Sequence, residues 1–459
     1  MGRLREQLEE YAGSGMLPFH MPGHKRLLPG EFFRTDVTEL KATDDLHAPE
    51  GILKEAQERA ARLYGADHTF FLVNGSTAGV LAAMSAGVRK GAKILMQRAS
   101  HRSAYHAVIL RELRPVYLYG AKSGAVGEAS AAAGHPLPEA GDPGVVSAEE
   151  LETALVRNPD AEAVFLTSPT YEGYSADLER AAQLCHARGI PLIVDAAHGA
   201  HFGFHPALPE SAVQAGADLV IMSVHKTLPS PTQTALLHMQ GELINPERVQ
   251  AFLSIYQTSS PSYPLMAAID DCMEYLEKGG SAIWEEFLAR RAFLDRMLKE
   301  TAYIRIDSTE PCKLLLYPED GQSGIQLAEA LREHGIEPEM SLPAYVLLIL
   351  SVMDTEEMYG KLAEAVHDCD RAYALRKSIF PPLRFQCLKG REKLRLSEAW
   401  EAEREQVSEE AAEGRISAAF VMAYPPGRPI LVPGERITGE HLDEIRKLRA
   451  AGCVLYGVD

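Results

Sequence analysis

Short apolar runs alternate with amphipathic stretches along the first half of the chain. Seven runs of aliphatic, β-branched and aromatic residues occur between residues 69 and 239. Most of the stretches between them place apolar residues at helical spacing, as in SAEELETALVRN and DLERAAQLCHARG. Buried strands that alternate with helices predict a mostly parallel sheet, covered on both faces. The runs are residues 69–73, 93–96, 115–119, 163–167, 191–196, 218–223 and 234–239.

The second half of the chain predicts a smaller α/β unit and a separate tail. Residues 264–300 have the pattern of long helices. Two predicted strands, CKLLLY and YVLLILSV, then alternate with two predicted helices, GIQLAEALREHG and EEMYGKLAEAVHDCDRAY. The Ala-, Gly- and Pro-rich residues 120–147 are typical of a surface loop. We therefore expect an N-terminal segment (1–50), a large domain (51–295), a small α/β domain (296–380) and a C-terminal domain (381–459).

Composition and charge narrow the class of protein. The 459 residues are 46% hydrophobic and 24% charged, which is ordinary for a globular protein. The net charge of −18 disfavours binding to nucleic acid or to anionic membranes. The six cysteines are scattered without a CxxC pair, so we expect reduced thiols. No apolar run reaches the ~18–20 residues of a membrane helix, and no signal peptide is evident, so we expect a cytoplasmic protein.

Polar residues follow two of the predicted strands at the point where each strand ends. Asp195 ends PLIVDA, and Lys226 follows DLVIMS within SVHK. Ligands of open α/β sheets bind outside the carboxyl ends of the strands, so both side chains should reach one crevice. The separation of 226 − 195 = 31 residues leaves room for one helical crossover between neighbouring strands.

This pair has the chemistry that pyridoxal 5′-phosphate (PLP) requires. A desolvated lysine amine can form a Schiff base with the cofactor aldehyde. A carboxylate beside the pyridine nitrogen keeps that nitrogen protonated, which makes the ring an electron sink. Alone, a lysine or aspartate at a strand end is more often part of an ion pair or a cap. We take both together as the site, with Lys226 as the Schiff-base residue and Asp195 as the pyridinium partner.

The cofactor phosphate needs its own binding site. VNGSTAGV follows the first strand and opens a helix, where Gly75 permits close backbone approach and Ser76 and Thr77 offer hydroxyls and amides. The same pattern is also compatible with an ordinary helix cap. Ser223 and His225, just before the lysine, could contact the same phosphate.

Three histidines follow Asp195 at spacings that resemble a metal triplet. His198, His201 and His205 are three and four residues apart. Intervening Gly199, Gly203 and Pro206 disfavour a single helical face, so we expect no metal site.

A set of motifs in order along the chain resembles one known family. Together they are similar to the Orn/Lys/Arg decarboxylases of PLP fold type I, in the short bacterial form related to biosynthetic arginine decarboxylase. The resemblance covers about residues 15–450, and HMPGHK with SxHK and DxAHGxH is specific as a set. The motifs are HMPGHK (20–25), TDVTEL (35–40), DDLHAPEGI (44–52), SHRSAYH (100–106), SPTYEGY (168–174), DAAHGAH (195–201), SVHK (223–226), QTSSPSYPLMAAID (257–270), YPPG (424–427) and PGE (433–435).

The resemblance implies a fold-type-I, PLP-dependent transferase-like architecture and further site residues. Ala197 would pack on one face of the cofactor ring, and His101 would stack on the other. His198 would lie near the phenolic oxygen. Thr258 or Ser259 would reach the phosphate of a neighbouring subunit.

The implied reaction is α-decarboxylation of a basic amino acid, with arginine preferred over lysine and ornithine, to an amine of the polyamine type. A homodimer or higher oligomer, with active sites at the dimer interface, is implied with it. The family's N-terminal wing domain is expected to be absent, because HMPGHK begins at residue 20. The distal cation of such substrates needs an acidic partner, for which Asp44 and Asp45 are candidates. A solvated acidic turn or a helix cap is the alternative for this pair.

Three other functions stay open from the residues. One is a different PLP reaction on the same scaffold, such as that of an aldolase, a lyase or an aminotransferase, for which Arg371 or Arg376 could bind a carboxylate. Another is a PLP-binding protein with a regulatory role. A P-loop or dinucleotide enzyme is disfavoured, because neither GxxxxGK[ST] nor a strand-linked GxGxxG is present.

Overall fold

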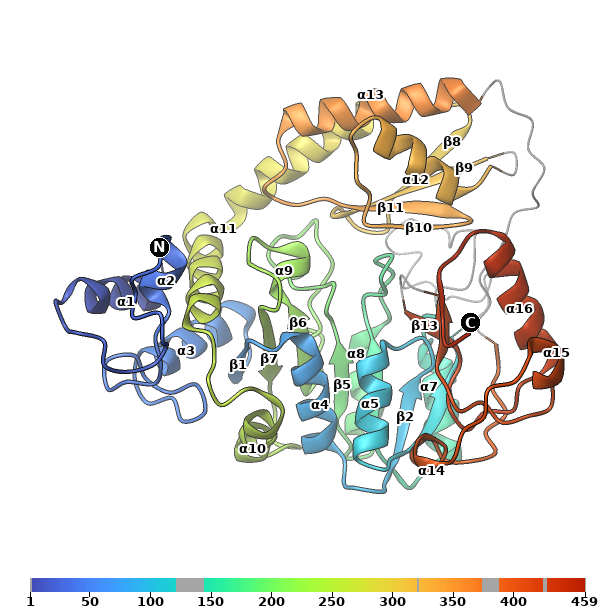
Figure 1. The fold of residues 1–459 in the computed structure, drawn as a ribbon, viewed down its shortest axis with the longest axis horizontal. Helices are drawn as coiled ribbons and strands as arrows, with labels where there is room; N and C mark the ends of the chain where they lie inside the picture. Colours follow the sequence, from blue (N-terminus) through green and yellow to red (C-terminus); the bar gives the residue numbers. More distant parts are fainter. Residues whose placement is uncertain (1, 121–143, 320–321, 374–387, 424–426, 459) are drawn as a thin grey trace. The chain divides into compact units, whose positions relative to one another are not determined.

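A computed structural model of the chain describes residues 2–120, 144–319, 322–373, 388–423 and 427–458 (Figure 1). Most of the loop expected at 120–147, the start of the YPPG motif and Arg376 lie outside these described residues. The chain forms two compact units. Unit 1 comprises Met1–Arg89, Glu162–Ser168 and Leu178–Glu285, and unit 2 comprises Lys90–Ala161, Pro169–Asp177 and Glu286–Asp459.

The sheet of unit 1 follows the apolar runs of the sequence. Its strand order is β1-β7-β6-β5-β4, in which β4, β5 and β6 run parallel and β7 is antiparallel to both its neighbours. Every residue of β5, β6 and β7 is buried, as expected of strands covered on both faces. Since β1 and β6 both oppose β7, four of these five strands run in the same direction, which confirms the expectation that parallel strands predominate. Its strands are β1 (His68–Leu72), β4 (Ala161–Thr167), β5 (Leu192–Asp195), β6 (Leu219–Ser223) and β7 (Ala235–Met239).

One helix of unit 1 is buried almost all round. α4 packs against β6, β7 and α10, and its sequence GSTAGVLAAMSAG is correspondingly apolar. A Cβ at Gly79 would lie 2.6 Å from Leu72 Cδ1, so a glycine is needed for this close approach to the sheet. The helices of unit 1 are α1 (Arg3–Gly13), α2 (Glu31–Thr35), α3 (Ile52–Tyr64), α4 (Gly75–Gly87), α8 (Leu178–His186), α9 (Val224–Thr227), α10 (Pro246–Tyr256) and the first part of α11 (Tyr263–Met297).

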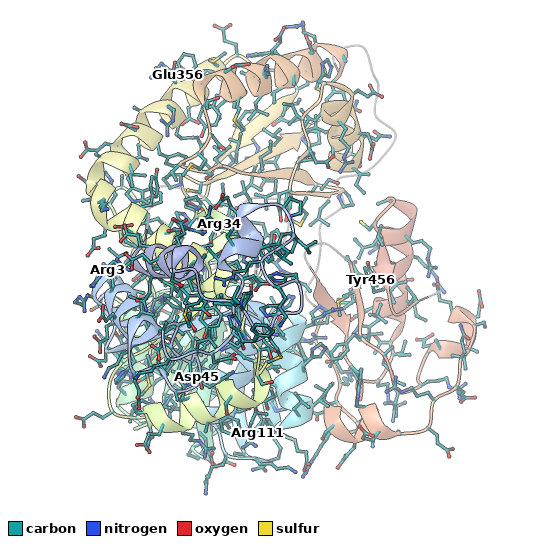
Figure 2. The ribbon with its side chains drawn as sticks, turned by 60° about the vertical axis from the view of Figure 1, so that its left-hand side comes forward. Arg3, Arg34, Asp45, Arg111, Glu356 and Tyr456 are labelled. Carbon is teal, nitrogen blue, oxygen red and sulfur yellow. The ribbon has the colours of Figure 1, made fainter. Side chains whose placement is uncertain are left out.

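The N-terminal segment of unit 1 combines a docked helix with an exposed apolar stretch. In α1, Leu4 and Leu8 are fully buried, and the amide of Leu4 donates to the Asp270 carboxylate at 3.1 Å. The chain from residue 16 to residue 32 instead leaves large apolar side chains in solvent; Figure 2 shows this side of the molecule. They are Met16, Leu17, Phe19, Met21, Leu27, Leu28 and Phe32.

Unit 2 contains a parallel strand pair and two small antiparallel sheets. The sheet orders are β10-β11-β9-β8 and β13-β12-β14, each with its own apolar core. The strands are β2 (Lys93–Gln97), β3 (Arg114–Leu118), β8 (Ile304–Asp307), β9 (Lys313–Pro318), β10 (Met340–Leu342), β11 (Tyr345–Ile349), β12 (Val421–Ala423), β13 (Arg428–Leu431) and β14 (Leu455–Tyr456). The helices are α5 (Arg102–Leu110), α7 (Ala148–Arg157), the rest of α11, α12 (Gly324–Glu333), α13 (Glu356–Tyr373), α14 (Leu396–Glu401), α15 (Glu409–Ala412) and α16 (Gly439–Ala450).

The two units cut across the domain boundaries expected from the sequence. Residues 90–161, expected within the large domain, group with the C-terminal part of the chain. Long-range contacts explain this grouping, since Arg98 pairs with Glu435 and the amide of Gly390 donates to Tyr119. Among the described residues, no helix is long and apolar enough to cross a bilayer.

A buried histidine in β7 generates a test of this core. His238 Nδ1 bonds Thr69 Oγ1 at 2.8 Å, and burial lowers the His238 pKa from 6.5 to about 3. Its Nε2 is buried without a hydrogen-bond partner among the described residues. The native state therefore keeps the ring neutral where the unfolded chain binds a proton.

We expect the free energy of unfolding to fall with acidity because of this residue. The contribution of the neutral His238 ring to the free energy of unfolding is complete above pH 6.5. It is lost as the pH falls toward 3, by about 1.4 kcal/mol per pH unit. Replacing it, His238→Gln, should flatten the slope in urea-unfolding series between these limits. Parallel pH curves for the two proteins would contradict the assignment.

Candidate active site

The ends of β5 and β6 bring Asp195 and Lys226 to neighbouring positions. The two strands pair in parallel, with Asp195 opposite Ile221, and Lys226 follows β6 in the short helix α9. This confirms that the two residues follow adjacent strands. The connection differs from the helical crossover for which the spacing leaves room, because residues 196–218 form turns. Glycines and prolines, among them Gly203 and Pro206, interrupt any helix there.

Lys226 contacts a histidine that was predicted for the same site. Its Nζ lies 3.1 Å from His198 Nε2. When the amine is an ammonium it can only donate, so Nε2 must accept and the ring proton must lie on Nδ1. Proton transfer between these two groups therefore requires no side-chain movement.

Asp195 is the buried carboxylate of this site and interacts electrostatically with Lys226. It is 4% exposed, and Oδ1 accepts the amide of Ala197 at 3.1 Å. Burial raises the pKa of this carboxyl, while the positive charge of Lys226 and the Ala197 hydrogen bond act against the rise. A cationic group placed beside it would be stabilised by the same carboxylate. Ala197 itself is buried and small, as the ring-packing role requires.

Ser223 and His225 precede Lys226 in the chain, and they differ in their ability to donate a hydrogen bond to a phosphate. The Ser223 hydroxyl is buried and has no partner among the described residues, and Thr227 Oγ1 is in the same state. His225 Nδ1 lies 2.8 Å from the carbonyl oxygen of Thr234, so it donates. Burial lowers the His225 pKa, and in the neutral ring Nε2 is then an acceptor. Ser223 can donate to a phosphate at any pH, whereas His225 can do so only when protonated.

The N-terminus of α4 and the helix that carries Lys226 are hydrogen-bonded to two consecutive residues, Gln233 and Thr234. The amide of Gly75 donates to the carbonyl of Gln233 at 3.0 Å, and His225 uses the carbonyl of Thr234. Gly75 has φ 72, which favours glycine. Asn74 is the N-cap, so Ser76 and Thr77 lie in the first turn, where helix amides lack internal partners. The NGST pattern therefore begins a helix, as the helix-cap alternative also expects, with Asn74 at the cap position.

Thr258 lies beside this helix start within the same chain. Its amide donates to Asn74 Oδ1 at 3.2 Å, and its carbonyl accepts from His47 Nε2 at 2.8 Å. Both Thr258 and Ser259 are exposed. The segment therefore links the α4 N-terminus to the turn that carries Asp45.

Asp44 has the contacts of a helix cap. Its two carboxylate oxygens accept the amides of Asp45, Glu50, Gly51 and Leu53, and these bonds lower its pKa against the effect of burial. This geometry is the cap alternative left open by the sequence. Asp45, which accepts the amide of His47 at 2.8 Å, lines a cavity of about 560 Å³ together with Glu39 and Glu50.

His101 belongs to unit 2, so the structure describes it apart from Lys226. It is the N-cap of α5, where Nδ1 accepts the amide of Ser103 at 3.3 Å. Its stacking on the cofactor ring stays a prediction.

The residues of unit 1 fit a cofactor that carries an aldehyde, a ring cation and a phosphate. The Ser223 hydroxyl is buried and lacks a partner in the described part of the chain, so it could donate a hydrogen bond to an acceptor such as a phosphate oxygen. Sequence reasoning assigned no role to Gln233 or Asn74, which hold the N-terminus of α4. Gln233 acts through its backbone at φ 80, for which the sequence carries no signal.

Comparisons with known proteins show the family to which the chain belongs. The family model described as Orn/Lys/Arg decarboxylase, major domain, matches residues 3–311, and the C-terminal domain of the same family matches residues 391–454. An arginine decarboxylase of Bacillus anthracis is 34% identical over 98% of this chain and 93% of its own length. The constitutive lysine decarboxylase of Escherichia coli is 25% identical over 88% of this chain and 68% of its own length.

Solved structures show the same fold. The lysine decarboxylase of Francisella novicida covers 99% of this chain and 79% of its own, with a TM-score of 0.81 at 18% identity. A serine palmitoyltransferase of Sphingomonas wittichii covers 70% of this chain and 77% of its own, with a TM-score of 0.55 at 17% identity.

Two substitutions of Lys226 separate its charge from its nucleophilic amine. With added PLP, the unaltered protein should develop a visible absorbance band from covalent attachment, which Lys226→Ala and Lys226→Arg should both lose. Only Lys226→Ala removes the positive charge near Asp195, so only this variant should raise the Asp195 pKa further. A band that survives in both variants would refute the assignment.

Proposed function

Because the chain belongs to the Orn/Lys/Arg decarboxylase family, we propose that it is a PLP-dependent enzyme that removes the α-carboxyl group of a basic amino acid as CO₂. The observation that carries this proposal is the contact of Lys226 with His198 beside the buried Asp195, at the ends of adjacent parallel strands. The product would be the corresponding amine.

PLP, when bound, supplies a ring that accepts the electron pair left by departing CO₂. Lys226 would be its covalent anchor, and Asp195 would hold a proton on the pyridine nitrogen. Ser223, Ser76, Thr77 and Gly75 would bind the phosphate, with His225 assisting in its protonated form. Ala197 and His101 would lie against opposite ring faces, and His198 near the phenolic oxygen.

The Lys226–His198 contact provides the acid that the reaction needs. After CO₂ leaves, the substrate Cα must regain a proton. Lys226 Nζ can deliver it and recover it from His198 across their 3.1 Å contact. Burial of Asp195 and half-burial of Lys226 limit water at this point and strengthen the electrostatic interactions.

The substrate side chain ends in a cation, for which Asp45 is the better of the two predicted partners. Four backbone amides from residues 45–53 donate to the Asp44 carboxylate, whereas one such amide, that of His47, donates to the Asp45 carboxylate in the described structure. Glu39 lines the same cavity, and its Oε1 is buried without a partner among the described residues. We propose arginine as the substrate, because the relatives at 32–34% identity include arginine decarboxylases, while the lysine enzymes are at 24–25%.

Release of ¹⁴CO₂ from carboxyl-labelled arginine, lysine and ornithine tests the reaction and the substrate together. We expect arginine to give the highest kcat/KM, at least about tenfold above the other two. Asp45→Asn should raise KM for the preferred substrate more than it lowers kcat. No release from any of the three would overturn the proposed function, and a preference for lysine would overturn only the choice of substrate.

A homodimer is proposed from the resemblance and from the exposed apolar segment at residues 16–32. Phe19 is 93% exposed, Leu27 86% and Leu17 75%, which is costly for a segment in water. A second copy of the chain would cover such a segment, and Thr258 or Ser259 would then reach the neighbour's phosphate.

Charges placed in this segment should break the dimer. Sedimentation velocity at micromolar concentration should give a dimer for the unaltered protein and a monomer with reduced activity for Phe19→Asp/Leu27→Asp. Val156→Asp is the matched control, since Val156 is a 66% exposed apolar residue elsewhere. A fully active monomer would contradict the proposal.

A cytoplasmic location is proposed on the cysteine pattern. The scattered cysteines include no CxxC pair, and the five in the described residues are free thiols. Reduced thiols are typical of a reducing compartment.

A further inference from the structure

A fully buried ion pair in unit 2 joins two distant parts of the chain. Arg98 and Glu435 are 0% and 2% exposed in their side chains, and Nη2 lies 3.0 Å from Oε2. Arg98 lies in the segment that matches the family's major domain, and Glu435 lies in the segment that matches its C-terminal domain. Since neither charge can reach water, each depends on the other.

The Arg98 side of the pair is fixed at several points. Its guanidinium donates to Tyr105 Oη at 2.9 Å and to the carbonyl of Ile430 at 3.3 Å. The Tyr105 hydroxyl in turn donates to the carbonyl of Arg98 at 2.6 Å. The backbone amide of Arg98 donates to the carbonyl of Leu118, at the end of β3.

The Glu435 side is held in a tight turn. Oε2 also accepts the amide of Val432 at 2.9 Å, and the Glu435 carbonyl accepts the amide of Ser417 at 2.8 Å. Gly434 has φ 94, and a Cβ there would lie 2.3 Å from the carbonyl oxygen of Leu394. The turn therefore holds the Glu435 carboxylate in one position.

His101 follows Arg98 by three residues and begins α5. The intervening Ser100 bonds the carbonyl of Gln97 at 2.6 Å, and Tyr105 lies on the first turns of α5 itself. Arg98 thus fixes both ends of the short segment that carries His101. We infer that Glu435 is a positioning residue for His101, acting through Arg98, an inference that rests on the ring-stacking role proposed for His101. The C-terminal domain would then influence the reaction without touching substrate or cofactor.

Hydrogen–deuterium exchange of the cofactor-free protein tests the positioning directly. Glu435→Gln keeps an acceptor for Val432 but removes the charge that Arg98 needs. We expect the amides of residues 98–106 to exchange at least about tenfold faster, because local opening becomes easier. Arg428→Met is the matched control: it breaks the buried pair of Arg428 with Glu172 in the same unit and should loosen residues 169–174 instead. Unchanged exchange at 98–106 in Glu435→Gln would overturn the inference.

Measurements on the PLP-bound enzyme test whether Glu435→Gln changes catalysis through His101. Glu435→Gln should change the visible circular dichroism of bound PLP and lower kcat about tenfold or more with little change in KM. In the His101→Ala background the same substitution should have no further effect. Additive effects of the two substitutions would refute the inference. No effect of His101→Ala alone on the bound cofactor would instead refute the proposed role of His101, while the exchange experiment still decides the positioning.

A second variant covers the case in which Glu435→Gln does not fold. Arg98→Met/Glu435→Gln removes both charges and so leaves no unpaired charge in the interior. We expect it to fold and still to show fast exchange at residues 98–106. Exchange as slow as in the unaltered protein would show that the ion pair is not the positioning device.

Discussion

The parallel pairing of β5 with β6 is the constraint on which the site depends. It places Asp195 at the end of one strand and lets Lys226 follow the next, so that a buried carboxylate and an amine share one desolvated region. In such a region opposite charges attract strongly, and each ionised form costs free energy unless it is matched. A cofactor with a ring cation and an aldehyde satisfies both groups at once.

The remaining parts of the site are arranged by the backbone around this pair. Residues 233–234 connect the start of α4 to the helix that carries Lys226, so the groups proposed to bind the phosphate and the proposed covalent anchor are joined through one stretch of backbone. Thr258 extends the same connection to the turn at residues 44–48. In unit 2, Arg98 of the buried Arg98–Glu435 pair lies three residues before His101 in the chain, and we propose that the pair holds the segment that carries this histidine.

Much of the fold and the centre of the site could be predicted from the sequence, because both depend on local patterns. Buried parallel strands are apolar throughout, and all seven predicted runs are strands in the structure. Other features depend on tertiary contacts that no local pattern encodes. Arg98 and Glu435 are 337 residues apart, Gln233 contributes only a carbonyl, and Asp44 serves as a cap because four amides converge on it. The unit boundaries differ from the expected domains for the same reason.

Lys226, just after the end of β6, is proposed as the one lysine to which the cofactor is attached. Borohydride reduction of the PLP-loaded protein, followed by peptide mapping with mass spectrometry, tests it most directly. We expect a pyridoxyl group on Lys226 alone. A pyridoxyl group on another lysine, with Lys226 unmodified, would contradict it.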